Sequence, residues 1–225
     1  MAIRAVLFDL DDTLLDGVGT NAERAGRVAA RIVRDHPELD PVELVSRLRN
    51  FSPVNGWTVR TSAVLRELGL EGSPCAEEAT GLTFYQGCFD LVRPYDGAID
   101  AIAELADRLV LGVITNGRDL IQRSKFDHLP FAGSFSVFMS SERAGCSKPA
   151  VEIFQQTLVE AGVQPHEAVF IGDRLDTDVL GGRDAGLRTV WFNHIGYPVL
   201  PEHPTPDAVI RRFAELPGAI RKFES

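Results

Sequence analysis

Three aspartates follow a short apolar run near the start of the chain: Asp9, Asp11 and Asp12. The run before them, Ala5-Val-Leu-Phe8, is typical of a buried parallel strand, and carboxylates crowded at its end repel one another unless a cation binds among them. Residues two apart on a strand point to the same side, so Asp9 and Asp11 face one site. One can act as nucleophile and metal ligand while the other serves as acid and base. An acidic turn without a chemical role is the alternative.

A hydroxyl, an amide and a glycine follow a later apolar segment, as Thr115-Asn116-Gly117. At the opening of a helix, these three groups can surround a phosphoryl group with hydrogen-bond donors, because the glycine lets the backbone approach closely. The alternative interpretation is a helix cap followed by a glycine turn.

Lys148 stands directly before Pro149, and proline is favoured in the first turn of a helix. We therefore expect Lys148 just before a helix, where its ammonium group can neutralise negative charge on a transferring phosphoryl group. A solvated surface lysine is the alternative. The neighbouring Cys146 is not required as a nucleophile, because an aspartate already fits that role.

A second acidic cluster begins at Ile171-Gly172-Asp173 and continues with Asp176 and Asp178. Acidic residues are favoured near a helix N-terminus, which is enough to explain Asp176 and Asp178. It does not explain Asp173, which lies at the end of an apolar strand. A divalent cation bound by carboxylate oxygens would account for the whole cluster.

The segments around these four candidate sites alternate between strand and helix patterns. We expect strands over 3–10, 109–114, 134–140, 168–171 and 189–192, and helices over 98–106, 120–126, 150–161 and 178–185. Such alternation predicts an α/β fold with a Rossmann-like, doubly wound parallel sheet and helices on both faces. In these sheets the site lies beyond the carboxyl ends of the strands, where all four candidate segments fall.

A helical region follows the first strand and precedes this alternation. We expect helices over 22–34, 42–48, 61–70 and 77–91, with Asn21 as the cap of the first. The first helix is amphipathic, and its polar side carries Arg24, Arg27, Arg31 and Arg34. This stripe is interpreted as a solvated face, with contact to an anionic substrate as the alternative. The sequence thus predicts a core domain, 1–15 and 93–225, and an α-helical subdomain inserted at 16–92.

The composition limits the partners of the chain. A net charge of −9 and a pI near 5.1 argue against nucleic acid or an anionic membrane surface as the main partner. They are compatible with a small anion that binds through a metal. Cys75, Cys88 and Cys146 are odd in number and lack paired spacing, which indicates reduced thiols. No secretory segment is recognised, and no apolar run approaches the roughly 20 residues of a membrane span. We expect a cytoplasmic monomer or homodimer.

Together, the four segments resemble the four ordered motifs of the haloacid dehalogenase superfamily. The matching residues are Phe8-Asp9-Leu-Asp11-Asp-Thr13, Thr115-Asn116-Gly117, Lys148-Pro149, and Gly172-Asp173 with Asp178. The resemblance covers nearly the whole chain, because 16–92 corresponds in position and helical character to the cap that this family inserts after its first motif. The Thr-Asn-Gly form is similar to a subgroup that includes nucleotide and acylneuraminate phosphatases.

The resemblance implies a phosphatase acting on a small phosphorylated metabolite. Asp9 would attack phosphorus and form an aspartyl-phosphate, while Asp11 would protonate the leaving oxygen and then activate water. Mg²⁺ would be held by the Asp9 side chain, the Asp11 backbone carbonyl and Asp173.

The remaining motif residues would serve the phosphoryl group. Thr115 and the amide of Asn116 or Gly117 would bind its oxygens, and Lys148 would balance the charge of nucleophile and phosphate. Asp178 would hold Lys148 or a metal-bound water. Opening of the cap would admit substrate, and its closure would exclude bulk water.

Three other functions remain as alternatives. A 2-haloacid dehalogenase displaces halide from carbon and does not need an acid at the second aspartate position, so Asp11 argues against it. A phosphomutase of the same architecture shares these residues and stays open. A non-catalytic binding module is disfavoured because every expected catalytic position is filled.

Substrate selectivity is expected to lie in the cap. The candidates there are Arg24, Arg27, Asn55, Trp57 and Arg60, each of which could equally be a surface or packing residue. His194, just past the last predicted strand, is a candidate for the rim of the site, with an ordinary loop histidine as the alternative.

Overall fold

A computed structural model describes residues 2–49, 57–82 and 91–224. The chain divides into two compact units: the core unit, Met1–Asp16 with Pro94–Ser225, and the helical unit, Gly17–Arg93. Of the residues singled out in the sequence, Asn55 and Cys88 lie outside the described residues, as do the side chain of Trp57 and most of the helix expected over 77–91. That the helical unit acts as a cap stays a prediction.

The core unit contains a six-stranded parallel sheet with the order β3-β2-β1-β4-β5-β6. Its strands are β1 (Ala5–Phe8), β2 (Val110–Thr115), β3 (Val137–Ser140), β4 (Ala168–Gly172), β5 (Arg188–Phe192) and β6 (Ala208–Ile210). The order reverses at β1, which lies between β2 and β4. The predicted Rossmann-like α/β fold is confirmed, and the ends of β1, β2 and β4 become neighbours.

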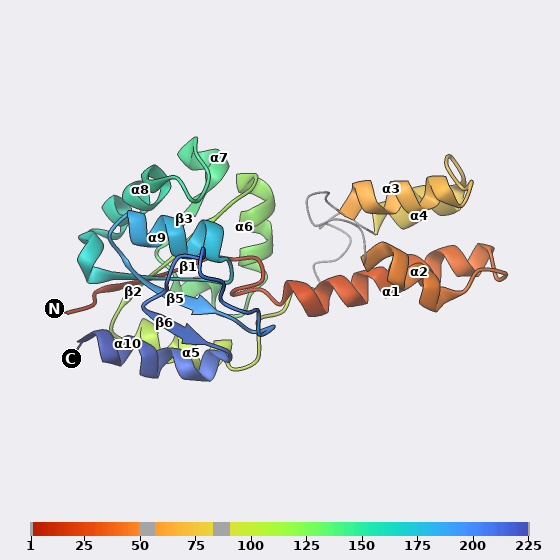
Figure 1. The fold of residues 1–225 in the computed structure, drawn as a ribbon. Helices are drawn as coiled ribbons and strands as arrows, with labels where there is room; N and C mark the ends of the chain where they lie inside the picture. The colour runs from red at the N-terminus through yellow and green to blue at the C-terminus, as the bar shows by residue number, and fades with distance from the viewer. Residues whose placement is uncertain (1, 50–56, 83–90, 225) are drawn as a thin grey trace. The chain divides into compact units, whose positions relative to one another are not determined.

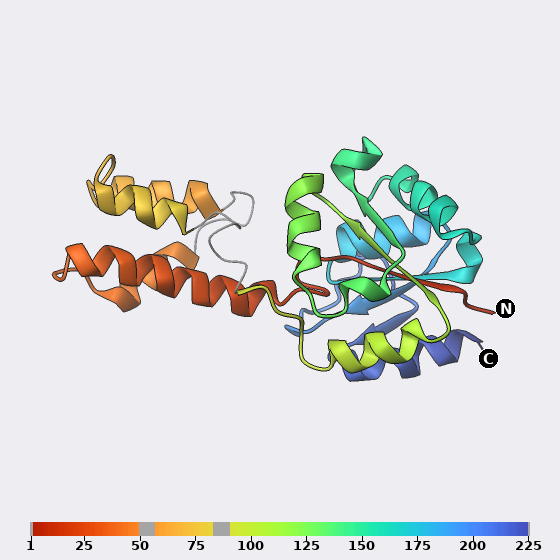
Figure 2. The ribbon, with the colours of Figure 1, turned by 180° about the vertical axis from the view of Figure 1, so that it is seen from behind.

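Helices cover both faces of this sheet. They are α5 (Ala98–Ala106), α6 (Asp119–Asp127), α7 (Ser141–Ala144), α8 (Val151–Ala161), α9 (Leu180–Asp184) and α10 (Leu216–Glu224). In both ribbon views α5 and α10 lie together on one face, while α8 and α9 lie on the other (Figures 1 and 2). The sequence did not predict β6, α7 or α10. Segments of three and four residues, as in β6 and α7, are too short to show a periodic pattern, whereas the nine-residue α10 was missed without such a reason.

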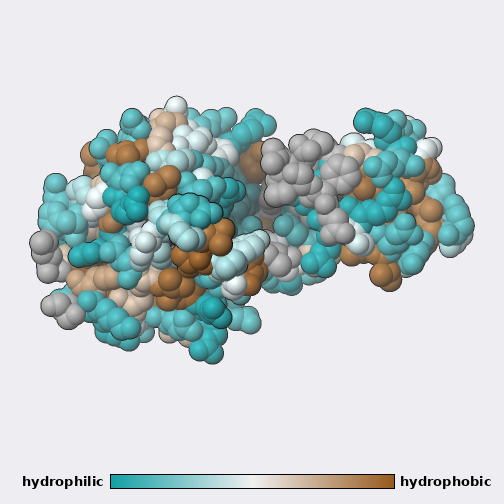
Figure 3. Space-filling model, viewed as in Figure 1, coloured by the Kyte–Doolittle hydropathy of each residue, from teal (hydrophilic) through white to brown (hydrophobic). Residues whose placement is uncertain are grey.

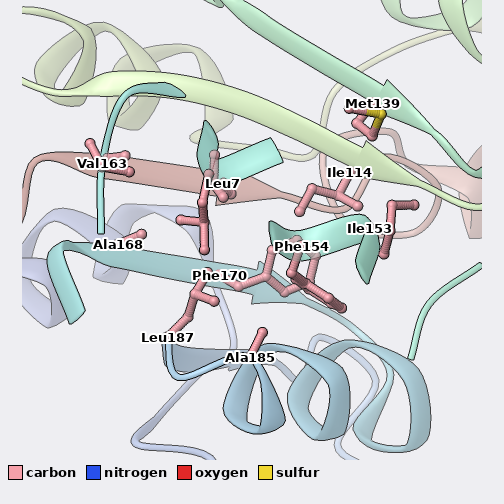
Figure 4. Close-up of a cluster of buried hydrophobic side chains, with 12 residues drawn as sticks. Leu7, Ile114, Met139, Ile153, Phe154, Val163, Ala168, Phe170, Ala185 and Leu187 are labelled. Carbon is pink, nitrogen blue, oxygen red and sulfur yellow. The ribbon is translucent and has the colours of Figure 1, made fainter. Parts of the chain in front are cut away.

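The apolar cluster beneath α8 and α9 holds the site end of the sheet in place. Figure 4 shows Leu7, Phe154 and Phe170 packed together, and the two phenylalanine rings meet edge to face with centroids 5.1 Å apart. Gly181 in α9 permits this close packing, because a Cβ there would lie 2.5 Å from the Phe154 ring and 2.9 Å from the Cα of Pro149. The packing therefore extends to the loop that carries Lys148.

Four helices form the described part of the helical unit, around a separate apolar cluster. They are α1 (Gly17–Asp35), α2 (Pro41–Arg49), α3 (Trp57–Glu67) and α4 (Pro74–Gly81). Figure 3 shows hydrophilic residues over most of the viewed face of the described part of this unit. Within the described ranges, none of the helices combines the length and apolar character needed to cross a bilayer.

Two expectations for α1 are wrong. The helix begins at Gly17, so Asn21 lies inside it and is not its cap; the buried hydroxyl of Thr20 in the first turns donates to the carbonyl of Leu91, 3.0 Å away. The arginine stripe is not uniformly solvated either. Arg24 is only 1% exposed, whereas the Arg34 side chain is 65% exposed, because helices packed on both sides of α1 bury more of its surface than one apolar stripe indicates.

Candidate active site

β1 delivers its aspartates to the carboxyl edge of the sheet. The backbone N–H of Asp9 donates to the carbonyl of Ile171 at 2.8 Å, which continues the pairing with β4 by one residue and fixes the direction of the Asp9 side chain. The chain then turns at Asp12, which has a φ of 59°, in the left-handed region that aspartate tolerates better than most residues. As a result Asp9 is buried, while Asp11 lies at the edge of the solvent.

Lys148 joins two of the acidic segments. Its Nζ lies 2.6 Å from Asp9 Oδ1 and 2.7 Å from Asp178 Oδ1, and all three side chains are buried. Burial lowers the pKa of Lys148, but the Asp178 and Asp9 carboxylates outweigh it and hold this pKa above its ordinary value. The ammonium group is therefore charged and bridges the nucleophile predicted on β1 to the acidic segment after β4.

The loop around Lys148 is fixed by Asn116 rather than by a helix. Asn116 Oδ1 accepts from the Lys148 N–H at 2.9 Å, and Asn116 Nδ2 donates to the Lys148 carbonyl at 3.1 Å. The expectation that Pro149 lies in the first turn of a helix is wrong, because α8 begins at Val151. A turn closed by the Ala150 N–H and the Ser147 carbonyl precedes the helix instead.

Thr115-Asn116-Gly117 only partly forms the predicted phosphate cradle. Thr115 and Asn116 line the site cavity, but the Gly117 N–H donates to Ser141 Oγ at 2.9 Å and Gly117 is not among the lining residues. Glycine is nevertheless required at this position. Its φ of 137° is unfavourable for other residues, and a Cβ would lie 3.1 Å from Gln122 Cγ.

Three carboxylates gather into a group that could hold a metal ion: Asp9, Asp173 and Asp178, with one oxygen of each within 4.8 Å of the others. Burial, opposed by Lys148 and assisted by Asp178, raises the pKa of Asp9 to about 7. Burial and the carboxylates of Asp9 and Asp178 raise the pKa of Asp173 to about 9. A donor set made of crowded oxygens fits a hard divalent cation such as Mg²⁺, which would offset both the burial of these charges and their mutual repulsion.

Neighbouring residues hold this acidic group in shape. Trp191 Nε1 donates to the Asp173 carbonyl at 2.8 Å, and Thr13 Oγ1 donates to Asp173 Oδ1 at 3.4 Å. Gly172 leaves the space that Asp178 occupies, because a Cβ there would lie 2.3 Å from Asp178 Oδ2. The glycine before Asp173 is thus needed for a close approach.

The Asp11 side chain contacts two residues of α6, Lys125 and Gln122, which the sequence analysis did not identify. Lys125 Nζ lies 2.8 Å from Asp11 Oδ1, and Gln122 Nε2 donates to Asp11 Oδ2 at 2.8 Å. Burial raises the pKa of Asp11, but Lys125 and Gln122 outweigh it and hold this pKa below its ordinary value. The available signal was two polar residues three positions apart on the helix after Thr115-Asn116-Gly117, a spacing that places them on one face.

The four segments meet at one cavity of about 200 Å³ in the core unit. Its lining is polar and comprises Asp9, Asp11, Asp12, Thr115, Asn116, Lys148, Asp173, Arg174, Thr177 and Asp178. Except for Gly117, the structure thus brings every catalytic, metal and phosphate residue predicted from the sequence to the same place. Its lining carries five carboxylates against two cationic side chains, Lys148 and Arg174, so a small anionic group would need a bound cation beside it.

Of the residues considered for substrate selectivity, His194 belongs to the core unit and is not among the residues that line this cavity. His194 contacts the Tyr95 hydroxyl through Nε2 at 3.0 Å and stacks on Phe192, with ring centroids 5.0 Å apart. This packing favours the interpretation of His194 as an ordinary loop residue. Arg24, Arg27 and Arg60 belong to the helical unit.

The fold and the site define a class: an α/β protein with a doubly wound parallel sheet and an acidic cavity at the carboxyl edge of that sheet. The profile of the haloacid dehalogenase-like hydrolase family matches residues 3–186. The chain belongs to this family, as the motifs predicted.

Its curated relatives include phosphatases. Glyceraldehyde 3-phosphate phosphatase of Methanopyrus kandleri is 31% identical over 98% of each chain. N-acylneuraminate-9-phosphatase of Mus musculus is 29% identical over 99% of this chain and 95% of its own. These similarities support the predicted class of enzyme, a phosphoric monoester hydrolase.

Solved structures agree on the fold. The HAD-hydrolase YfnB of Bacillus subtilis, bound to magnesium, is 24% identical with a TM-score of 0.70, over 98% of this chain and 99% of its own. A 2-haloacid dehalogenase of Pseudomonas syringae is 25% identical with a TM-score of 0.64, over the same shares of the two chains. This architecture is therefore shared with a 2-haloacid dehalogenase, so the choice between phosphate-ester hydrolysis and halide displacement depends on the side chains of the site.

Proposed function

We propose that this protein is a Mg²⁺-dependent phosphatase that hydrolyses a small phosphate monoester through an aspartyl-phosphate on Asp9. The observation that carries the proposal is the contrast between two aspartates two positions apart. Asp9 is buried against Lys148 and beside Asp173, whereas Asp11 has its own partners and a lowered pKa. Two carboxylates in different environments suit the separate roles of nucleophile and acid–base group.

The first half of the reaction forms the intermediate. Asp11 is ionised in the free protein, so it first takes the proton of a monoprotonated phosphate ester. An oxygen of Asp9 then attacks phosphorus in line, the bond from phosphorus to the leaving oxygen breaks, and Asp11 passes its proton to that oxygen. In the second half Asp11 accepts a proton from water, and the water oxygen attacks the phosphorus of the aspartyl-phosphate. Asp11 returns this proton to the departing phosphate, and both aspartates regain their starting states.

Positive charge and donors around Asp9 support both halves. Lys148 faces the Asp9 carboxylate and the transferring phosphoryl group, and the Thr115 hydroxyl lies in the same cavity as a donor to phosphoryl oxygens. Asp178 holds the Lys148 ammonium in this position. The amide of Asn116 or Gly117 is proposed as the second donor to the phosphoryl group.

Mg²⁺ is proposed as the cofactor. The Asp9 and Asp173 side chains and the Asp11 backbone carbonyl would hold it, with Asp178 as a supporting residue. When bound, the cation supplies charge stabilisation to the phosphoryl oxygens and to the surrounding carboxylates.

The helical unit is proposed as the cap that selects the substrate. Its predicted extent is 16–92, and its insertion directly after the β1 aspartates suits a part that admits substrate and excludes water. The names of the curated relatives support a small phosphorylated metabolite, such as a phosphorylated sugar or sugar acid, as substrate. A cytoplasmic monomer or homodimer stays our prediction for the location and assembly of the chain.

Phosphate release tests this proposal. A panel of sugar phosphates, nucleoside monophosphates and other phosphorylated metabolites should yield phosphate when Mg²⁺ is present, with activity lost in EDTA and restored by Mg²⁺. Sugar phosphates isomerised without phosphate release would favour the phosphomutase. Halide release from a 2-haloacid by the metal-free protein would favour the dehalogenase, and binding without any turnover would favour the non-catalytic module.

A further inference from the structure

Helix α6 presents two polar side chains to the acid–base aspartate. Lys125 Nζ lies 2.8 Å from Asp11 Oδ1 and 2.9 Å from Asp11 Oδ2, so the ammonium group contacts both carboxylate oxygens. Gln122 Nε2 adds a third contact, to Oδ2 at 2.8 Å. A carboxylate held by two groups from one rigid helix has a defined orientation.

Gln122 also connects Asp11 to the predicted phosphate site. The same Nε2 atom lies 2.5 Å from Thr115 Oγ1 and 3.1 Å from the Asn116 carbonyl. One amide group therefore contacts the acid–base residue, a phosphate-binding hydroxyl and the backbone between β2 and α6. The absence of a side chain at Gly117 leaves room for Gln122, because a Cβ there would lie 3.1 Å from Gln122 Cγ.

The burial of these two residues is not needed to build the helix. Lys125 is 4% exposed and Gln122 is 3% exposed, while the Asp11 side chain is 40% exposed at the cavity. A buried ammonium group costs free energy relative to an apolar side chain of the same size, even when it is paired. α6 already has Phe126 for its apolar contacts, with ring centroids 5.2 Å from Phe135 and 5.3 Å from Phe138.

We propose that Gln122 and Lys125 are positioning residues that orient the Asp11 carboxylate for proton transfer and hold it in a fixed relation to Thr115. The inference rests on the proposed phosphatase function and deepens it. Neither residue touches the reacting atoms; both act through Asp11. They should therefore matter most where the leaving oxygen depends on Asp11 for its proton.

Leaving groups of different basicity separate this role from a structural one. The alkoxide of an alkyl phosphate is strongly basic and needs a proton as it departs, whereas p-nitrophenolate departs readily without one. Loss of a correctly placed acid thus slows an alkyl ester far more than a p-nitrophenyl ester. A general loss of folded protein slows both esters equally.

The test compares Lys125→Met and Gln122→Met, which keep side-chain length and remove the polar group. We expect kcat for an alkyl phosphate to fall by roughly 100-fold in Lys125→Met, with a smaller fall in Gln122→Met. KM and the p-nitrophenyl phosphate kcat should change by less than about tenfold. Arg123→Ala, on the same helix, is the control, because Arg123 lies over the Phe138 ring at 3.9 Å and removing it disturbs α6 without reaching Asp11.

A double-mutant cycle with Asp11→Asn completes the test. If Lys125 acts through Asp11, then Lys125→Met should slow Asp11→Asn little further, whereas independent effects would multiply. Equal losses on both esters, losses matched by Arg123→Ala, or multiplying effects in the cycle would overturn the inference while leaving the phosphatase intact. A wild-type protein that releases phosphate from neither ester, nor from any metabolite of the panel, would overturn the proposed function and the inference with it.

Discussion

The core unit and the helical unit each contain a cation that pairs with two acids, and the acids of the two groups differ in exposure. In the core unit Lys148 pairs with Asp9 and Asp178, and the side chains are 2%, 10% and 2% exposed. In the helical unit Arg31, 9% exposed, pairs with Asp35 and Glu78, whose side chains are 41% and 56% exposed. The exposed Arg34 contacts the same two acids. The first group is withdrawn from water, whereas the acids of the second remain in it.

This difference indicates what each group is for. Buried charges lose the favourable free energy of hydration, and their mutual attraction does not reliably compensate for this loss. A buried pair is therefore weak evidence of a gain in stability. Charges at a surface lose little hydration and are screened by salt, so they contribute little. We infer that the buried group is kept for chemistry, and that the surface group is an ordinary feature of a solvated helix pair.

The largest effect is expected from Asp9→Asn. The amide keeps the size of the carboxylate and can still accept from Lys148, but it cannot form the aspartyl-phosphate, so kcat should fall by roughly 10⁴-fold or more. Steady-state phosphate release measures this loss, and circular dichroism checks the fold. Asp35→Asn makes the same change in the helical unit and should leave kcat near the wild-type value. Turnover close to wild type in Asp9→Asn would contradict the nucleophile assignment.

The second-largest effect is expected from Lys148→Met. Removing a buried cation leaves the Asp9 and Asp178 carboxylates facing each other, which costs about 3–5 kcal/mol of unfolding free energy. The loss of charge beside the phosphoryl group should also lower kcat by roughly 10²- to 10³-fold. Chemical denaturation and kinetics measure the two effects. Arg31→Met is the matched change, and a comparable loss of stability there would remove the distinction between the two groups.

The crowded acids give the metal-free protein a pH dependence that Mg²⁺ should reduce. The pKa of Asp9 is raised from 3.8 to about 7 and that of Asp173 from 3.8 to about 9. Between the ordinary pKa of 3.8 and these raised values, the folded protein binds more protons than the unfolded chain. Stability of the metal-free protein should therefore decrease as pH rises through this window. Added Mg²⁺ binds the ionised carboxylates, so it should raise Tm more at about pH 8 than at about pH 5.5.

Asp173→Asn sharpens this prediction. It removes one crowded carboxylate and one proposed ligand, so the metal-free variant should lose less stability with rising pH and gain little from Mg²⁺. Thermal unfolding in EDTA and in Mg²⁺ at the two pH values measures both changes. A rise in Tm with Mg²⁺ that is unchanged in Asp173→Asn would place the cation elsewhere.

The smallest effect is expected from the surface group. A double-mutant cycle on Arg31 and Glu78 should give a coupling close to the error of the measurement, and 1 M salt should reduce it further. Urea denaturation of the two single variants and the double variant provides the coupling. A large, salt-insensitive value would show that exposure of the carboxylates does not separate the two groups.

The sequence predicted five of the six strands and the meeting of the candidate site residues at one edge of the sheet. Asp9, Asp11 and Asp173 follow the ends of apolar strands, and a parallel sheet brings such ends to one edge. The α/β fold follows from the same alternation of patterns.

Features set by contacts between distant segments were not predicted. Gln122 and Lys125 look like ordinary polar residues on α6, and only the position of that helix in the folded core unit brings them to Asp11. Arg24 resembles a solvated arginine on a helical wheel, yet the packing around α1 buries it. Gly117 is engaged by Ser141, 24 positions away, which no local pattern indicates.

Direct trapping of the intermediate tests the central claim. Wild-type protein and Mg²⁺ are mixed with its best substrate carrying a radiolabelled phosphoryl group, the reaction is quenched in acid, and the labelled peptide is mapped. The account predicts acid-stable label on the peptide that contains Asp9, released by hydroxylamine as expected of an acyl phosphate. Label on another residue, or turnover with direct transfer to water as shown by inversion at a chiral phosphorus, would contradict it.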